Sequence, residues 1–354
     1  MLKTEAERIA SSTEAEKLGA QPRTITVARQ GDSKLDILQI LPGTWKNTEA
    51  LNGHGWNMIA LPFIPDVAVP NFNGRYRLLL NQYNETLRFT VADENVKNRG
   101  LATFGHLKEN NTGDQVVVAL DYDQMINQIV ADDFPQTNPD IHGRPGLPIH
   151  REPGLFILAT NNANTWNNLG RQASIPHGNS LLALGAGVEI DGPRSKIAPV
   201  RGLPSGASAD MLADNYLMPY DHFEANPFQG VFNPKQPHLL LETALPQNVI
   251  RTTELQVSTA IGTGGILNIP FAADQANPTR MDSTFWIMEL DEPSQFRSGN
   301  RLIMQYLQVV NLEFFPRRDG IPGLAIWPHV SINTMEWVAP PTTEKLTQAS
   351  VAAA

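Results

Sequence analysis

The sequence of 354 residues contains no cysteine at all. Disulfide bonds, iron–sulfur clusters, thiolate-ligated haem, zinc fingers and cysteine nucleophiles are therefore excluded. Any metal ion or haem iron would have to be held by histidine, carboxylate, tyrosine or methionine side chains. The sequence has eight histidines, which are the first candidates for such a role.

Long hydrophobic runs are also missing from the sequence. No stretch approaches the 18 or more consecutive apolar residues of a membrane-spanning helix, and the first thirty residues lack the apolar core of a signal peptide. We therefore expect a cytoplasmic protein with no membrane span.

Charged residues make up only 18% of the chain, and they sum to a net charge of −9. A protein that binds nucleic acid or an anionic membrane through its surface usually carries a basic patch or a positive net charge. Nucleic acid is therefore an unexpected partner for this chain.

Short runs rich in Val, Ile, Leu, Phe and Thr, separated by Gly, Pro, Asn and Asp, fill most of the chain after residue 35. Several of these runs alternate apolar and polar residues, as half-buried strands do, and no helical pattern lies between them. The pattern predicts an all-β protein with an antiparallel barrel or sandwich. The expected strands are Asp36–Leu41, Trp56–Phe63, Tyr76–Asn81, Thr86–Ala92, Gln115–Leu120, Gly154–Ala159, Ser180–Ile190, Thr253–Ala260, Gly265–Phe271, Ser283–Leu290, Leu302–Phe315 and Leu324–Val338.

The same pattern divides the chain into five regions. An N-terminal arm with a short helix is expected over 1–34, where Thr4 and Glu7 have capping-box spacing. The β-rich regions cover 35–195 and 251–340, a loop-rich connection covers 196–250, and a loose tail covers 341–354. The sequence leaves open whether the two β-rich regions close into one barrel or form two barrel-like halves.

Three histidines lie in or beside predicted strands. His329 shares a polar strand face with Ser331 and Asn333, while the residues between them form an apolar face. This face suits a polar barrel interior or simply solvent. His177 precedes a strand, where a histidine that caps backbone groups in a turn is an equally ordinary interpretation.

His150 and Glu152 are two residues apart, which places an imidazole and a carboxylate on the same side of an extended chain. With His177 they could form a two-histidine, one-carboxylate iron site. A plain surface hydrogen bond between them is the more ordinary interpretation of such a pair.

Five of the six tryptophans lie in or near predicted strands, among them Trp45 and Trp327. Most strand tryptophans pack in a core. A barrel lined with them could also enclose a flat apolar ligand.

Several short sequence motifs occur together, in an order that is similar to the order in one group of proteins. They include Gly43-Thr-Trp45, His150-Arg-Glu-Pro-Gly154, Ala173-Ser-Ile-Pro-His-Gly-Asn179 and Trp327-Pro-His-Val-Ser331. Over about residues 40–338 the chain resembles bacterial and fungal all-β proteins described as haem-binding. Its Gly-Thr-Trp also resembles the first strand of nitrobindin and fatty-acid-binding-like barrels.

This resemblance implies an antiparallel barrel of the lipocalin or nitrobindin type. In nitrobindins a histidine late in the barrel ligates haem iron, and the family handles reactive nitrogen species. By analogy, His329 would be the haem ligand, with His177, Trp45 and Trp327 beside the porphyrin.

The sequence is therefore compatible with three functions. The first is a haem-binding barrel with peroxidase-like activity or activity on reactive nitrogen or oxygen species. The second is a carrier of an apolar small molecule, or an enzyme acting on one, without iron. The third is a non-catalytic structural or assembly protein, for which a homo-oligomer would be expected.

Overall fold

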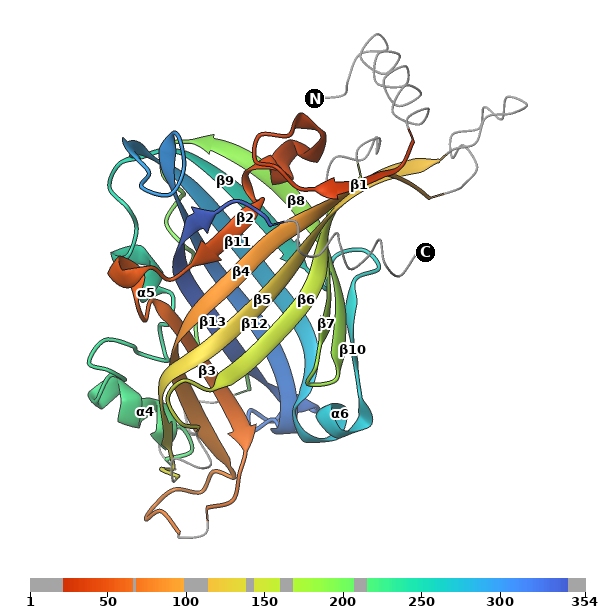
Figure 1. Cartoon of the computed structure of the whole chain (residues 1–354). Helices are drawn as coiled ribbons and strands as arrows, with labels where there is room; N and C mark the ends of the chain where they lie inside the picture. The colour runs from red at the N-terminus through yellow and green to blue at the C-terminus, as the bar shows by residue number, and fades with distance from the viewer. Residues whose placement is uncertain are drawn as a thin grey trace.

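The computed structural model describes residues 22–65, 68–98, 114–137, 143–159, 168–206 and 215–342. In this part of the chain nearly all regular structure is β, as predicted (Figure 1). The strands are β1 Thr24–Val27, β2 Gly43–Lys46, β3 Gly55–Pro62, β4 Tyr76–Asn98, β5 Gln115–Phe134, β6 Pro148–Ala159, β7 Leu169–Ile175, β8 Asn179–Asp191, β9 Val249–Ser258, β10 Gly265–Asn268, β11 Asn277–Pro293, β12 Asn300–Pro316 and β13 Leu324–Ala339. The helices are η1 Ser33–Ile40, η2 Glu49–Leu51, α4 Met218–Ala225, α5 Leu239–Thr243 and α6 Pro270–Ala276.

The strands form one closed antiparallel barrel. The hydrogen-bonded order runs β4, β2, β13, β12, β11, β9, β8, β7, β6, β5, and the pairing of β5 with β4 closes the ring. β3 also lies between β13 and β4, below β2. Closure leaves no long unpaired edge within the ring, which removes the aggregation risk of an open sheet.

The two β-rich regions expected from the sequence share this single barrel. Strands β2 to β8 come from the first region and β9 to β13 from the second. The regions join where β8 pairs with β9 and β10, and where β13 pairs with β2 and β3. The alternative of two barrel-like halves is therefore wrong.

Two strand predictions also need correction. Residues 36–41 fall largely in the 3-10 helix η1 and not in a strand, since a short apolar run does not distinguish a strand from a buried helix. The segments Tyr76–Asn81 and Thr86–Ala92 belong to one strand, β4, of 23 residues. Tyr83 and Glu85, which lie between them, are buried and bond to Tyr306 inside the barrel. Gln82 and Asn84 alternate with them and bond to the segment before β3 on the other face, so this stretch continues the strand and does not form a turn.

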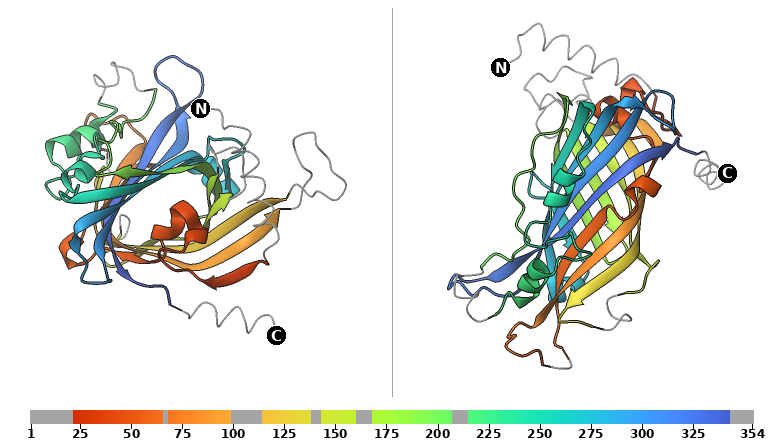
Figure 2. Two further views of the ribbon diagram at one scale, coloured as in Figure 1. Left: turned by 90° about the horizontal axis from the view of Figure 1, so that it is seen from above. Right: turned by 90° about the vertical axis from the view of Figure 1, so that its left-hand side faces the viewer.

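The upper end of the barrel, at the top of Figure 1, is filled by side chains. Leu35 and Leu38 of η1 are fully buried there, and they pack against Trp45, Phe89 and other apolar residues from around the ring. The view along the barrel in Figure 2 shows η1 lying over this opening. Hydrophobic burial therefore closes the upper end, and only the lower part of the interior is left for polar groups.

The connection between β8 and β9 packs against the outside of the barrel wall. Its helices α4 and α5 lie beside the ring in Figure 2, where apolar residues of 197–241 form a second hydrophobic cluster with the wall. The buried Arg194 donates to Gln305 Oε1 and Leu241 O, which fastens the start of this connection to β12.

The expected N-terminal helix lies within residues 1–21 and most of the expected tail within 343–354, both outside the described residues. None of the helices in the described part of the chain is both long and apolar enough to cross a membrane.

Candidate functional site

The barrel brings His329, His150 and His177 to the same, lower end of its interior. His329 lies near the start of β13, His150 near the start of β6, and His177 in the turn between β7 and β8. All three strand ends are at the bottom of Figure 1, away from η1. The rings of His150 and His177 stack on each other, and both contribute to the lowered pKa of His329.

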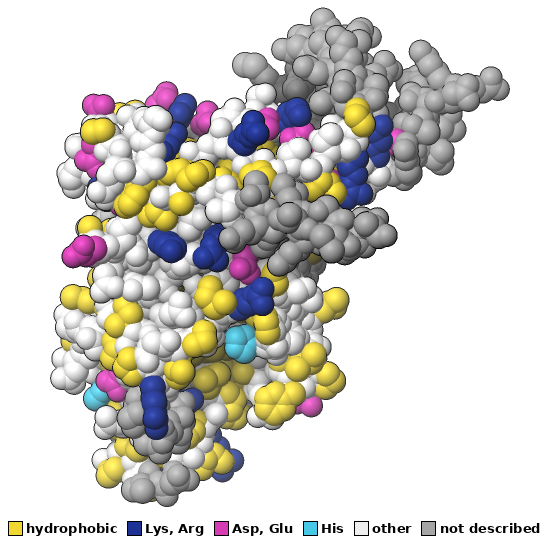
Figure 3. Space-filling model, in the orientation of Figure 1, with side chains coloured by type: hydrophobic (Ala, Val, Ile, Leu, Met, Phe, Trp, Pro, Cys, Tyr) yellow, Lys and Arg dark blue, Asp and Glu magenta, His cyan; other side chains and the backbone are white. Residues whose placement is uncertain are grey.

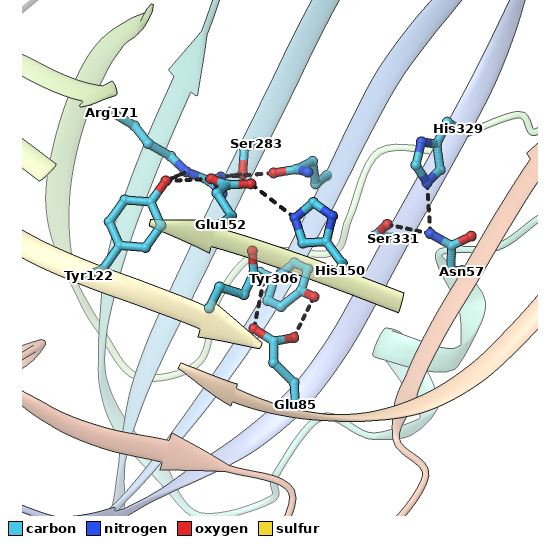
Figure 4. Close-up of polar contacts among 12 residues, drawn as sticks. Asn57, Glu85, Tyr122, His150, Glu152, Arg171, Ser283, Tyr306, His329 and Ser331 are labelled. Atoms are coloured by element: carbon cyan, nitrogen blue, oxygen red, sulfur yellow. Dashed lines mark hydrogen bonds and ion pairs between the residues drawn. The ribbon is translucent and has the colours of Figure 1, made fainter. Parts of the chain in front are cut away.

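His329 projects into the interior, as the strand alternation predicts. Val330 and Ile332 pack in the cluster on the wall, whereas Asn333, on the same face as His329, donates to a carboxylate inside the barrel. Asn57 of β3 holds the ring, with 2.7 Å between Asn57 Nδ2 and His329 Nε2 (Figure 4). The amide of Asn57 also donates to Ser331 Oγ at 3.0 Å. With the amide nitrogen of Asn57 as the donor, His329 Nε2 accepts this hydrogen bond, as the unprotonated nitrogen of a neutral imidazole does.

The surroundings of His329 keep its ring neutral. Burial, and to a smaller extent the nearby His150 and His177, lower the pKa of His329 to about 4. His329 as a whole residue is half-buried. At neutral pH this imidazole therefore offers a lone pair and no charge.

This low pKa predicts a pH dependence of stability. The unfolded chain binds a proton on His329 below pH 6.5, whereas the folded chain does so only near pH 4. The wild-type protein should therefore lose unfolding free energy, relative to His329→Gln, as the pH falls from about 6.5 to about 4. Urea unfolding of both proteins at pH 7 and pH 4.5 measures this difference, and parallel pH curves would contradict the assignment.

His150 belongs to a buried group of charged and polar side chains. Its Nε2 lies 3.3 Å from Glu152 Oε2, so the two side chains share one side of β6 as their spacing predicts. Glu152 pairs with Arg171 of β7 at 2.6 Å, and Tyr122 donates a short hydrogen bond to the same carboxylate oxygen. Arg171 also donates to Ser283 Oγ, which ties the group to β11 (Figure 4).

Glu152 is an ionised carboxylate in this group. Burial alone would raise the pKa of Glu152, but the charge of Arg171, together with hydrogen bonds from His150 and Tyr122, lowers it to about 2. His150 is therefore held by a permanent negative charge. A carboxylate that orients an imidazole in this way is a recurring arrangement in acid–base sites.

A second buried carboxylate, Glu85, lies on β4 inside the ring. It accepts hydrogen bonds from Tyr306, Gln124 and Asn333, and no cation among the described residues pairs with it. Burial raises the pKa of Glu85, although its three hydrogen bonds act in the opposite direction. Glu85 thus joins strands β4, β5, β12 and β13 through polar contacts below the apolar core.

The expected iron site of His150, Glu152 and His177 is not formed. The rings of His150 and His177 stack with centroids 5.8 Å apart and planes 20° apart. A metal ion lies close to the plane of each imidazole that ligates it, so near-parallel stacked rings cannot share one ion. Glu152 is already committed to Arg171, and the described residues contain no cluster of three or more histidine or acidic side chains suited to a metal ion.

The two tryptophans expected beside a porphyrin lie elsewhere. Trp45 is fully buried in the upper core and donates to Leu41 O at 2.9 Å. Trp327 is fully buried in the cluster on the wall, where it stacks on Phe314 and donates to Phe314 O. Of the expected site residues, the structure therefore brings together the histidines and Glu152, and it places both tryptophans in packed cores.

Sequence analysis missed four residues of the site, namely Asn57, Glu85, Tyr122 and Arg171. A weak signal existed for Tyr122 and Arg171, because each lies on the mostly apolar face of its strand. Inward-facing polar residues on these strands and on β6, which carries Glu152 between them, indicate a shared polar group. Their pairing depends on strand register, which the sequence alone did not fix.

Comparisons with known proteins add little to this geometry. No protein-family profile and no curated protein matches the chain. The crystal structure of Rv2717c from M. tuberculosis is a similar solved structure, with 12% sequence identity and a TM-score of 0.34. The match covers 85% of this chain and 97% of that chain, and no functional argument rests on a likeness at this level.

Proposed function

We propose that the protein binds haem in the lower part of the barrel, with His329 as the iron ligand. The observation that carries this proposal is the neutral imidazole of His329 on β13. It faces the interior of the barrel, and its Nε2 accepts a hydrogen bond. Haem iron in proteins is commonly held by a neutral imidazole of this kind. The resemblance to nitrobindin-type barrels noted in the sequence points to the same residue.

The chemistry of the donor set fits haem in one further respect. His329 Nε2 would hold the iron, and the amide of Asn57, which now donates to Nε2 and to Ser331 Oγ, would have to give up its hydrogen bond to Nε2. The lost hydrogen bond is weak compared with a metal–imidazole bond. By donating to Nε2, Asn57 keeps the His329 imidazole in the tautomer in which Nε2 carries no proton.

Exposed hydrophobic side chains surround the same end of the barrel. Leu267, Ile269 and Phe271 are 77%, 48% and 73% exposed, and Ile269 contacts the turn that carries His177. Figure 3 shows hydrophobic side chains gathered over the lower part of this face, near β10 and α6. Exposed apolar surface beside the histidines suits contact with a large flat apolar ligand such as a porphyrin.

Bound haem would supply the gas-binding and redox chemistry of iron. The chain would contribute His150, which Glu152 orients and which can hold or release a proton beside a bound ligand. Arg171 would not act on a ligand directly, because Glu152, Ser283 and Gln308 occupy its guanidinium. This arrangement supports the peroxidase-like or reactive-nitrogen activity expected from the sequence.

Titration of the purified protein with haem tests the proposal. The wild-type protein should give a sharp Soret band at one equivalent, His329→Ala should lose that band, and His329→Gly should regain it on addition of free imidazole. His222→Ala is the matched control, since His222 lies on α4 outside the barrel, stacked on Phe134. A missing band in the wild-type protein, or an unchanged band in His329→Ala, would rule out this site.

A further inference from the structure

A cavity that none of the histidines lines opens at the upper end of the molecule. It measures about 400 Å³, and we call it the upper cavity. Its wall comes from the segment after β1, the residues around β2, the β11–β12 turn and the end of β13. Its volume lies within the range of small-molecule sites, which is about 300–1,000 Å³.

One side of the upper cavity is rigid and apolar. Pro42, Pro340 and Pro341 line it together with the buried Trp337, whose indole donates to Pro42 O at 2.9 Å. Trp337 fits there because Gly43 has no side chain: a Cβ at Gly43 would lie 2.1 Å from Trp337 Nε1. Prolines and a fixed indole lose little conformational freedom when a ligand packs against them.

The other side of the upper cavity carries two arginines. Arg29 and Arg297 both line the cavity, and no carboxylate in the described parts of the chain forms an ion pair with either of them. Arg297 lies over the ring of Trp337 at 5.9 Å and gives one hydrogen bond, to Asn300 O. Most of the hydrogen-bonding capacity of the two guanidinium groups is therefore unused.

Arg29 and Arg297 place two positive charges beside one cavity in a protein with a net charge of −9. Other arginines at this end of the molecule pair with carboxylates, among them Arg251 with Glu289 and Arg301 with Glu336. A guanidinium group recognises a carboxylate well because its planar fork matches the two oxygens. The apolar side of the upper cavity favours a ligand that also has an apolar part, which an inorganic anion lacks.

We propose that the upper cavity binds a small organic carboxylate, whose charged group meets Arg29 and Arg297 and whose compact apolar body packs against Trp337 and the prolines. Benzoate has this chemistry, and benzyl alcohol is its uncharged counterpart of similar size. This site does not depend on haem binding at the other end of the barrel.

Isothermal titration calorimetry of the full chain with sodium benzoate at low salt tests the proposal. We expect a dissociation constant of about 1 mM, since a ligand of this size has limited binding energy. Benzyl alcohol and inorganic phosphate should each bind at least about tenfold more weakly, because each lacks one of the two required features.

The variant Arg29→Gln should weaken benzoate binding about tenfold and leave the fold intact, because Arg29 is exposed and forms no ion pair with a described residue. Arg297→Gln should weaken binding similarly. The matched control is Arg23→Gln, a nearby arginine that pairs with Asp93 and does not line the cavity. Equal binding of benzyl alcohol, equal or tighter binding of phosphate, unchanged affinity in Arg29→Gln, or no heat from benzoate would overturn the proposal.

Discussion

Arg171→Met should lower the free energy of unfolding by about 3–5 kcal/mol, because it leaves the charge of a buried glutamate without its partner. Arg171 and Glu152 are both almost fully buried, and 2.6 Å separates Arg171 Nη2 from Glu152 Oε1. Arg171 also donates to Tyr122 Oη, Ser283 Oγ and Gln308 Oε1, and these acceptors would lose their donor. Urea unfolding at pH 7 measures the loss.

The loss in Arg171→Met should shrink at lower pH. Without the arginine, burial raises the pKa of Glu152 above that of the unfolded chain, so the folded variant takes up a proton first. The stability of the variant relative to wild type should therefore rise as the pH falls from 7 to about 4. Constant destabilisation over this range would show that the charge on Glu152 is not the cause.

Two further variants separate charge from packing. The double variant Glu152→Gln with Arg171→Met should be more stable than Arg171→Met alone, because no unpaired charge remains. Arg151→Met is the matched control, since Arg151 is exposed and lies 3.4 Å from Asp123 at the surface. It should change the stability by less than about 1 kcal/mol.

The sequence predicted the class of fold because strand alternation and turn residues are local signals. It could not show that residues 82–85 of β4 continue the strand, because polar residues between two apolar runs normally indicate a turn. In the barrel Asn81, Tyr83 and Glu85 face a polar interior, and partners on β5 and β12 satisfy their side chains. Those partners lie up to 223 residues away in the sequence, beyond the reach of any local pattern.

The candidate site was predicted in part for the same reason. The polar face of His329 and the pairing of His150 with Glu152 follow from the two-residue period of a strand. The ion pair of Glu152 with Arg171 depends on the register between β6 and β7, where Gly154 lies opposite Ala173. Register is set by the packing of the whole ring, so a single sequence contains only an indirect record of it.

The tryptophan of the Trp-Pro-His phrase gives the second large expected effect. Trp327→Ala should lower the free energy of unfolding by about 3–5 kcal/mol, since it removes a fully buried indole from a packed cluster. Trp327 stacks on Phe314 with ring centroids 4.6 Å apart, and it contacts Tyr76 at the same distance. Urea unfolding measures this loss, and Trp327→Phe, which keeps an aromatic ring, should lose less.

The same variant tests whether Trp327 contributes to a cofactor pocket. Trp327 is two residues from His329, yet its neighbours Tyr216 and Phe314 belong to the cluster on the wall and not to the polar interior. Haem titration of the folded Trp327→Ala protein should therefore give the wild-type affinity, while His329→Ala should show the reverse, with stability largely kept and the Soret band lost. If Trp327→Ala lost haem affinity without losing stability, the porphyrin would have to contact the cluster on the wall. Trp327 would then belong to the haem site and not only to the packed core.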